Sequence, residues 1–118
     1  MLKQWLVCLL VANCKALTSI YMPNFNTQNV IYMNNMFYGC ESLKEINISN
    51  FDTRNVKDMS YMFHKCSSLK TIDIFNFNFE NVDVEYMFSY CSNELKKKIK
   101  TQNMNIKEKA FKNFDLIT

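Results

Sequence analysis

Apolar residues recur along the chain in columns whose members lie 26 positions apart. The columns are Cys14, Cys40 and Cys66; Leu17, Leu43 and Leu69; Ile20, Ile46 and Ile72; Phe25, Phe51 and Phe77; and Val30, Val56 and Val82. A tandem period between about 20 and 50 residues is typical of solenoids, propellers and arrays. The pattern therefore predicts copies of one structural unit that stack in sequence order, each burying its apolar side against the next.

Each repeat contains a short segment in which apolar and polar residues alternate: Leu17–Met22, Leu43–Ile48 and Leu69–Ile74. This period of two is typical of a half-buried strand. One strand per repeat, stacked across repeats, predicts a parallel sheet with one exposed face. The side chains expected on that face are Ser19 and Tyr21, Glu45 and Asn47, and Thr71 and Asp73.

A corner follows each predicted strand, at Asn24–Thr27, Asn50–Thr53 and Asn76–Phe79. We expect its phenylalanine to point inward and to stack on the phenylalanines of the neighbouring repeats. The Asn, Asp and Thr side chains of the corner are expected to bond the local backbone, as these residues do in turns. They are therefore interpreted as turn residues and not as catalytic carboxylates.

Beyond the corner, Val30, Met33, Met36 and Phe37 are spaced by three, three and one positions. This spacing indicates the buried face of a short helix, which Asn55 or Asp58 would cap in the second repeat. A methionine column at helical spacing could suggest thioether ligands for a soft metal. Core packing is the favoured interpretation, because methionine fills irregular apolar gaps well.

The first 12 residues, MLKQWLVCLLVA, allow two interpretations. Lys3 followed by an apolar run is typical of the start of a secretory signal. Alternatively, Val7, Leu10 and Val11 fall in the apolar columns of the next repeat, which favours a degenerate first repeat. Apolar residues at its outward positions suggest a further turn before it, so that the chain would form part of a longer array. No apolar run reaches the roughly 18 residues of a membrane span.

The repeat pattern fades after residue 93, and a basic segment follows. Leu95 and Ile99 are one helical turn apart, and Ile106, Ala110, Phe111 and Phe114 lie on one helical face. We therefore predict a repeat body over residues 1–93 and a helical cap over 94–118 that covers the last repeat, as terminal repeats require. The cap lysines are expected to form a solvated face. Binding of acidic lipid or nucleic acid through them is the alternative, and it would weaken steeply with salt.

Composition narrows the classes of partner. The chain holds 14 Lys and Arg against 11 Asp and Glu, and the excess lies in the cap. The nearly neutral repeat body therefore offers no basic stripe, and we expect no nucleic-acid partner. Asn is abundant beside a single Gly, so Asn is expected to take the left-handed turn positions.

Four of the five cysteines occupy one column of the repeat, where stacking would place them on one interior line. The favoured interpretation is a row of buried thiols that pack as small apolar residues. Disulfides between neighbouring turns and a metal site are the alternatives. The sequence contains no CxxC pair and a single histidine, His64, which we expect at an exposed helix position. No catalytic, cofactor-binding or metal-binding residues are expected.

The segment MFYGCESLKEINISNFDTRNVKDM, continued by SYMFHKCSSLKTIDI, resembles the 26-residue repeat of bacterial surface proteins, the BspA-like class of leucine-rich repeats. The resemblance covers roughly residues 7 to 93. It implies a leucine-rich-repeat-like solenoid of strand plus short helix. Together with the cap predicted above, this gives an α/β fold with parallel strands on one side, short helices on the other and a helical C-terminal cap. The resemblance also implies a place at the cell surface or outside the cell, and a role in adhesion or host binding.

These observations favour a non-catalytic module that binds a protein or glycan partner. A rigid concave strip formed by Ser19, Tyr21, Glu45, Asn47, Thr71 and Asp73, with Lys44 and Lys70 beside it, would lose little ordering entropy on binding. The alternative is an intracellular or fragmentary structural scaffold without a dedicated ligand. A cytoplasmic location is the alternative to the surface.

Overall fold

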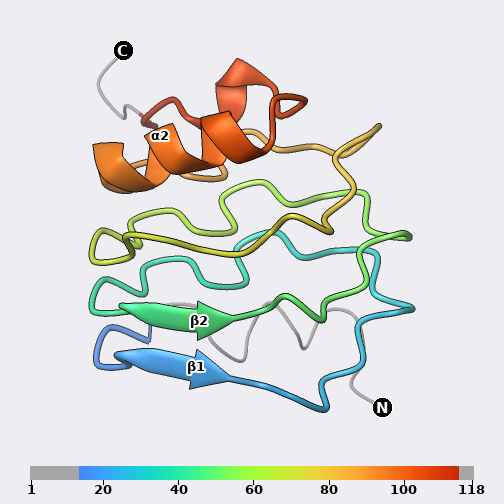
Figure 1. The fold of residues 1–118 in the computed structure, drawn as a ribbon, viewed down its shortest axis with the longest axis horizontal. Helices are drawn as coiled ribbons and strands as arrows, with labels where there is room; N and C mark the ends of the chain where they lie inside the picture. The colour runs from blue at the N-terminus through green and yellow to red at the C-terminus, as the bar shows by residue number, and fades with distance from the viewer. Residues whose placement is uncertain (1–13, 115–118) are drawn as a thin grey trace.

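The computed structural model describes residues 14–114, and its elements are β1 (Ser19–Tyr21), β2 (Glu45–Asn47), α2 (Asn93–Gln102) and the short 3-10 helix η1 (Glu108–Ala110). The chain winds through successive coils that lie one above another, and α2 lies across the last of them (Figure 1). The two interpretations of residues 1–12, signal or first repeat, concern a segment outside the described residues.

The first two predicted strands pair in parallel. Ser19 is opposite Glu45, Ile20 opposite Ile46 and Tyr21 opposite Asn47, so members of the same column face each other. The third predicted strand, Leu69–Ile74, is not a strand in the structure. Its alternation is nevertheless observed, because Ile72 and Ile74 are buried while Thr71 and Asp73 are exposed. Alternation fixes which side chains face inward, but a strand also needs a bonded neighbour.

The predicted short helices are wrong: each is a run of turns, which we call the turn segment (residues 33–40, 59–66 and 84–91). Its backbone N–H groups alternate between two kinds of partner. Met36 N donates to Met33 O at 3.3 Å within the coil, whereas Phe37 N donates to Met62 O of the next coil at 2.9 Å. An α-helix would direct every N–H along its own axis, and it could not bond the next coil in this way.

Left-handed residues produce this alternation. In the first turn segment they are Asn35 (φ 63°) and Gly39 (φ 76°). The same positions of the next two turn segments hold Tyr61 and Lys65, and Tyr86 and Tyr90, with φ between 57° and 63°. Asn thus takes a Gly-like role at Asn35, as predicted, but side chains that normally avoid this region take it elsewhere.

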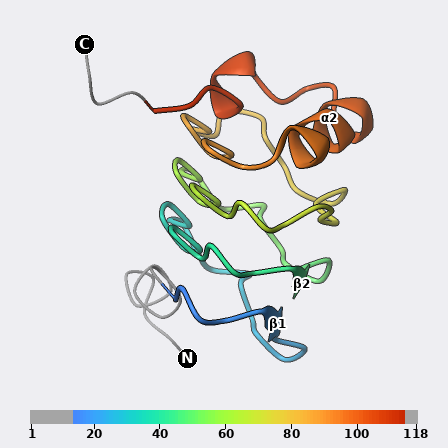
Figure 2. The ribbon, with the colours of Figure 1, turned by 90° about the vertical axis from the view of Figure 1, so that its left-hand side faces the viewer.

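Two ladders of phenylalanine rings fill the core. The predicted corner ladder is confirmed for Phe51 and Phe77, whose rings stack with centroids 6.4 Å apart. Phe25 is half-buried, and its ring is tilted by 53° against Phe51 at a centroid distance of 5.9 Å. The second ladder runs through the turn segments, with centroids 5.3 Å apart for Phe37 and Phe63 and 5.5 Å for Phe63 and Phe88. Figure 2 shows the turn segments on the side of the stack away from β1 and β2.

The cysteine column lies inside the stack, and Cys40, Cys66 and Cys91 are buried with free thiols. Cys66 Sγ donates to Phe37 O at 3.1 Å and Cys91 Sγ to Phe63 O at 3.0 Å, so each thiol bonds the preceding coil. Burial raises the pKa of the Cys91 thiol to about 12. Cys40, Cys66 and Cys91 therefore pack as small apolar side chains, as predicted, whereas Cys14 at the start of the column is half-buried.

A helix follows the last coil, as predicted, but it is shorter than the expected span of 94 to about 114. Ser92 Oγ caps α2 by accepting a bond from Leu95 N at 3.1 Å, and Leu95 and Ile99 are buried against the core. The helix ends at Gln102. Tyr86 N then donates to Lys109 O at 3.0 Å and Phe88 N to Ala110 O at 2.8 Å. The second half of the cap therefore bonds the last turn segment as another coil would.

Candidate functional site

The predicted binding strip lies on one side of the stack. The pairing of β1 with β2 places exposed Ser19 beside Glu45 and exposed Tyr21 beside Asn47. Tyr21 is 73% exposed. The segment that carries Thr71 and Asp73 runs over β2 on the same side in both views (Figures 1 and 2), and both side chains are exposed. The six predicted residues thus form one exposed surface, which we call the strand face.

Two side chains of the strand face also shape the backbone. Asn47 Oδ1 accepts bonds from Ser49 N at 3.3 Å and Ser49 Oγ at 2.8 Å. Asp73 Oδ1 accepts a bond from Phe75 N at 3.1 Å. These are Asx turns, so replacing either residue by Ala would disturb the turn as well as the surface.

Phe75 extends the strand face, and sequence analysis missed it. Its side chain is 74% exposed, directly after buried Ile74. The signal was available, because Pro23, Ser49 and Phe75 share a column and an aromatic residue there follows the last inward position of the strand. A shallow depression of about 190 Å³ lies near the other end of the face, between Tyr21, Pro23 and Asn47.

The corner residues hold the coils together. Asn26, Asp52 and Asn78 bond the local backbone as predicted, each accepting from the N–H two residues ahead. The threonines instead bond the next coil: Thr27 Oγ1 accepts from Asp52 N at 2.7 Å, and Thr53 Oγ1 accepts from Asn78 N at 2.9 Å. Both threonines are buried at 2% exposure. The prediction of a local role was therefore wrong for threonine.

His64 is not at an exposed helix position: its side chain is 3% exposed. Its ring stacks on Tyr38 at 4.6 Å, and the edges of Tyr61 and Tyr90 contact it at centroid distances of 5.7 Å. His64 lies between two left-handed residues of its turn segment, Tyr61 and Lys65, and is not part of a helix. Burial lowers the pKa of His64 below its ordinary value, and the charge of Lys65 lowers it further.

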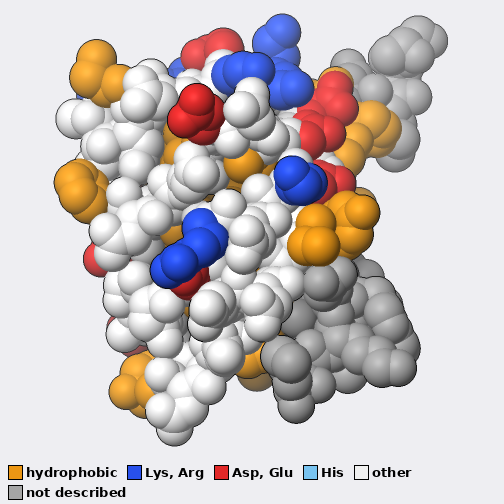
Figure 3. Space-filling model, turned by 90° about the vertical axis from the view of Figure 1, so that its right-hand side faces the viewer, with side chains coloured by type: hydrophobic (Ala, Val, Ile, Leu, Met, Phe, Trp, Pro, Cys, Tyr) orange, Lys and Arg blue, Asp and Glu red, His pale blue; other side chains and the backbone are white. Residues whose placement is uncertain are grey.

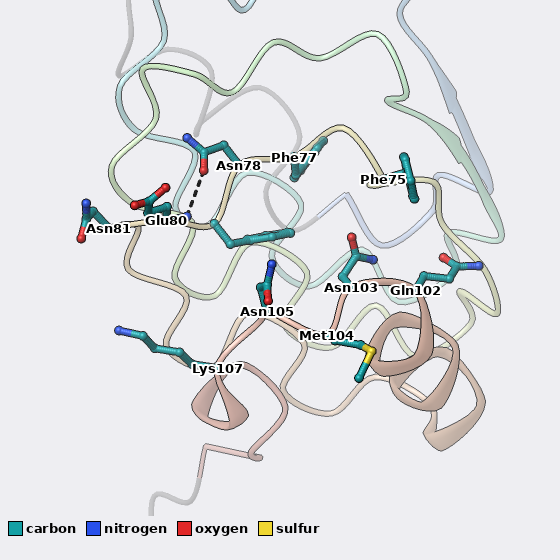
Figure 4. A pocket seen from close by; sticks show the side chains of 11 residues that line it. Phe75, Phe77, Asn78, Glu80, Asn81, Gln102, Asn103, Met104, Asn105 and Lys107 are labelled. Carbon is teal, nitrogen blue, oxygen red and sulfur yellow. Dashed lines mark hydrogen bonds between the residues drawn. The ribbon is translucent and has the colours of Figure 1, made fainter.

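A pocket of about 650 Å³ lies between the last corner and the loop after α2. Figure 4 shows the two walls: Phe75, Phe77 and Asn78 on one side, and Gln102 and Asn103 on the other. The aromatic side chains of this pocket include Phe79, which stands where the preceding repeats have Thr27 and Thr53. This pocket, which we call the corner pocket, was not predicted from the sequence.

Several cap lysines pair with carboxylates. Lys98 Nζ lies 3.0 Å from Glu94, Lys100 Nζ lies 3.0 Å from Glu108, and Lys109 Nζ lies 3.8 Å from Asp83. Basic and acidic side chains are interspersed on the side of the molecule shown in Figure 3. Exposed pairs of this kind contribute little to stability, but they break up the basic surface that an acidic ligand would need.

Within residues 14–114, no group of three or more His, Cys, Asp or Glu side chains is arranged to hold a metal ion. In the same part of the chain, no helix has the length and apolar character needed to cross a membrane.

Comparison with known proteins gives one family. No curated protein matches the chain, and no solved structure matches it. A family model matches residues 9–117, nearly the whole length of the sequence. The chain therefore belongs to the family described as "Mycoplasma protein of unknown function, DUF285".

Proposed function

We propose that the chain is a non-catalytic interaction module that binds a protein partner through the strand face. The observation that carries this proposal is the register of β1 and β2. It aligns exposed side chains into columns while Ile20 points into the core. Such columns form a rigid surface, so a partner would bind it without a large cost of ordering side chains or backbone.

Tyr21 and Phe75 are the expected anchors of the partner. Both are aromatic, and they are 73% and 74% exposed. Aromatic side chains dominate the binding energy of many interfaces because they bury a large area and have few rotatable bonds. Asn47, which is opposite Tyr21 in the register, and Asp73, two residues before Phe75, are both exposed and would provide polar contacts.

We further propose that the stacked coils form a short solenoid of the BspA-like leucine-rich-repeat type, with residues 1–93 as repeat body and 94–118 as cap. Protein binding at the cell surface or outside the cell is the role that fits such a module. The strand face of this chain is small, so useful affinity would come from several modules acting together.

The test compares how much of a protein partner each single variant captures in a pull-down. Tyr21→Ala should reduce capture at least about tenfold, corresponding to a loss of about 1.4 kcal/mol of binding free energy. Asp73→Asn should also weaken capture, because it removes the charge but keeps an oxygen that can accept the bond from Phe75 N. Thermal unfolding of both variants should match the unmodified protein.

The matched control is Tyr32→Ala. Tyr32 is 50% exposed, but it pairs with Asp58 in a separate set of bridges away from β1 and β2. This variant should retain full capture. Equal capture by the Tyr21 and Tyr32 variants would refute binding through the strand face.

The second candidate is a structural scaffold without a dedicated ligand. The Asx turns favour it, because Asn47 and Asp73 use their side-chain oxygens to hold their own turns. The mature N-terminal sequence together with cell fractionation separates the two. Recovery in the cytosol favours the scaffold, and exposure at the cell surface favours the binding module.

A further inference from the structure

The cap closes the two sides of the stack differently. On the turn side it continues the phenylalanine ladder, because Phe111 stacks on Phe88 with centroids 5.7 Å apart. On the corner side the ladder of Phe25 and Phe51 ends at Phe77, and the corner pocket lies beyond it. The pocket therefore occupies the place that the corner of another coil would fill.

The chain's own repeat is a poor occupant of this place. In the preceding corners a buried threonine accepts a backbone N–H from the next coil. The last corner has Phe79 instead, which cannot accept that bond, and its ring centroid lies 6.0 Å from that of Phe77. Phe79 in place of threonine thus removes the acceptor of a coil-to-coil hydrogen bond and adds an aromatic surface. Such a surface suits a ligand other than another coil of the protein.

The opposite wall is rich in side-chain amides. Gln102, Asn103 and Asn105 line it, and the side chains of Asn103 and Asn105 point toward the last corner (Figure 4). Asn103 Nδ2 is buried, and the structure gives it no hydrogen-bond partner. Buried donors are nearly always paired, so this N–H group lacks an acceptor, and a small rotation of the Asn103 side chain would present it to a ligand oxygen in the pocket. The backbone of Asn103 is fixed by its own bond to Ile99 O at 2.8 Å.

The charges of the pocket nearly cancel. Glu80 and Lys107 are the charged residues of its lining, one of each sign. A site for phosphate or carboxylate would need an excess of cations. Amides donate and accept equally well, and they suit a ligand whose groups do both, which is the property of hydroxyl groups.

We propose that the corner pocket binds a neutral oligosaccharide. Phe77 and Phe79 would contact the apolar face of a sugar ring, and the amide of Asn103 would donate to a ring or hydroxyl oxygen. The volume lies within the range of about 300–1,000 Å³ that is usual for small-ligand sites. The pocket shares Phe75 with the strand face, but Phe77, Phe79 and Asn103 belong to the pocket alone. Tyr21 belongs to the strand face alone. Variants of these unshared residues therefore test the two proposals separately.

The test is calorimetric titration of the full chain with neutral probes: maltotriose, cellotriose, N,N′-diacetylchitobiose and lactose, with 3′-sialyllactose as the charged comparison. We expect at least one neutral probe to bind with a Kd in the millimolar range or below. Phe79→Thr, which restores the residue of the preceding repeats, should weaken that binding at least about tenfold. Asn103→Asp, which replaces the amide donor with an acceptor, should do the same.

Asn26→Asp is the matched control. It adds the same charge at the first corner and keeps the oxygen that accepts the bond from Gln28 N. This variant and Tyr21→Ala should bind the probe as the unmodified protein does, and thermal unfolding verifies that all variants are folded. The proposal is overturned if no neutral probe binds at concentrations up to about 10 mM. It is also overturned if only the charged probe binds, or if both pocket variants bind the neutral probe with full affinity.

Discussion

The turn side and the corner side of the stack use the same residue, phenylalanine, and end differently. Phe37, Phe63 and Phe88 continue into Phe111 of the cap, and backbone bonds join every pair of coils along the way. The corner ladder stops at Phe77, next to the corner pocket. The difference teaches that the cap continues the stack at the turn segments, in addition to the core contacts of Leu95 and Ile99, but does not continue it at the corner.

The largest difference between the sides should appear on truncating their rings. Phe63 is fully buried between Phe37 and Phe88, so Phe63→Ala should lower the free energy of unfolding by about 3–5 kcal/mol. Phe77 has a ring neighbour in the preceding coil and the pocket on its other side. Phe77→Ala should therefore cost about 2 kcal/mol. Denaturant unfolding measures both, and equal losses would contradict the asymmetry.

A smaller loss is expected from the corner threonines. Thr53→Val keeps the shape of the side chain but leaves Asn78 N, now bonded to Thr53 Oγ1 at 2.9 Å, without its acceptor. We expect a loss of about 1–2 kcal/mol in the free energy of unfolding. The matched comparison is Thr27→Val one coil earlier, which removes the acceptor that Asp52 N bonds at 2.7 Å and should cost a similar amount. If neither variant loses stability, these coil-to-coil bonds do not stabilise the corner.

The buried histidine makes the turn side sensitive to acid. The pKa of His64 is lowered in the folded state and close to 6.5 in the unfolded chain. The unfolded chain therefore binds the proton first as the pH falls below about 6.5, and stability declines from there downward. His64→Phe keeps an aromatic ring beside Tyr38 and should remove this decline. Unfolding curves between pH 7 and pH 5 measure it, and an unchanged decline in the variant would exclude His64 as the cause.

The smallest effect concerns the left-handed residues of the turn segments. Lys65 has φ 63° and an exposed side chain, so Lys65→Gly relieves a strain of about 1–2 kcal/mol. The greater freedom of glycine in the unfolded chain offsets about 0.5–1 kcal/mol of this gain. We expect a net stabilisation of less than about 1 kcal/mol. Gly39→Ala, at the same position of the preceding repeat, should destabilise the protein, and melting temperatures compare the two.

The sequence predicted the stacking better than the form of the elements. Columns of identical residues fixed which side chains meet, so the corner ladder and the buried thiols could be predicted. The turn segments could not, because the spacing of Val56, Met59 and Met62 is the same for a helix and for turns with two left-handed residues. The identities of Tyr61 and Lys65 did not indicate a left-handed backbone, since neither residue type favours that conformation. His64 was misplaced for the same reason.

The candidate sites divide in a similar way. Strict alternation identified the outward residues of the strand face, because a period of two leaves one choice of side. The corner pocket depends on how the cap loop at 102–107 lies against the last corner. The residues of this loop do not belong to the 26-residue repeat, so the repeat pattern could not predict how the loop packs. Phe79 was the available signal, a departure from the threonine column at the place where the stack ends.

Amide hydrogen exchange tests the unequal closure of the stack most directly. Phe63 N bonds Met87 O at 2.9 Å, and Phe88 N bonds Ala110 O of the cap at 2.8 Å. Both amides should exchange only on large-scale opening. The amide of Asn81, an exposed residue at the corner pocket, should exchange orders of magnitude faster. If the amide of Phe88 exchanged as fast as that of Asn81, the cap would not close the turn side, and this account of the fold would be wrong.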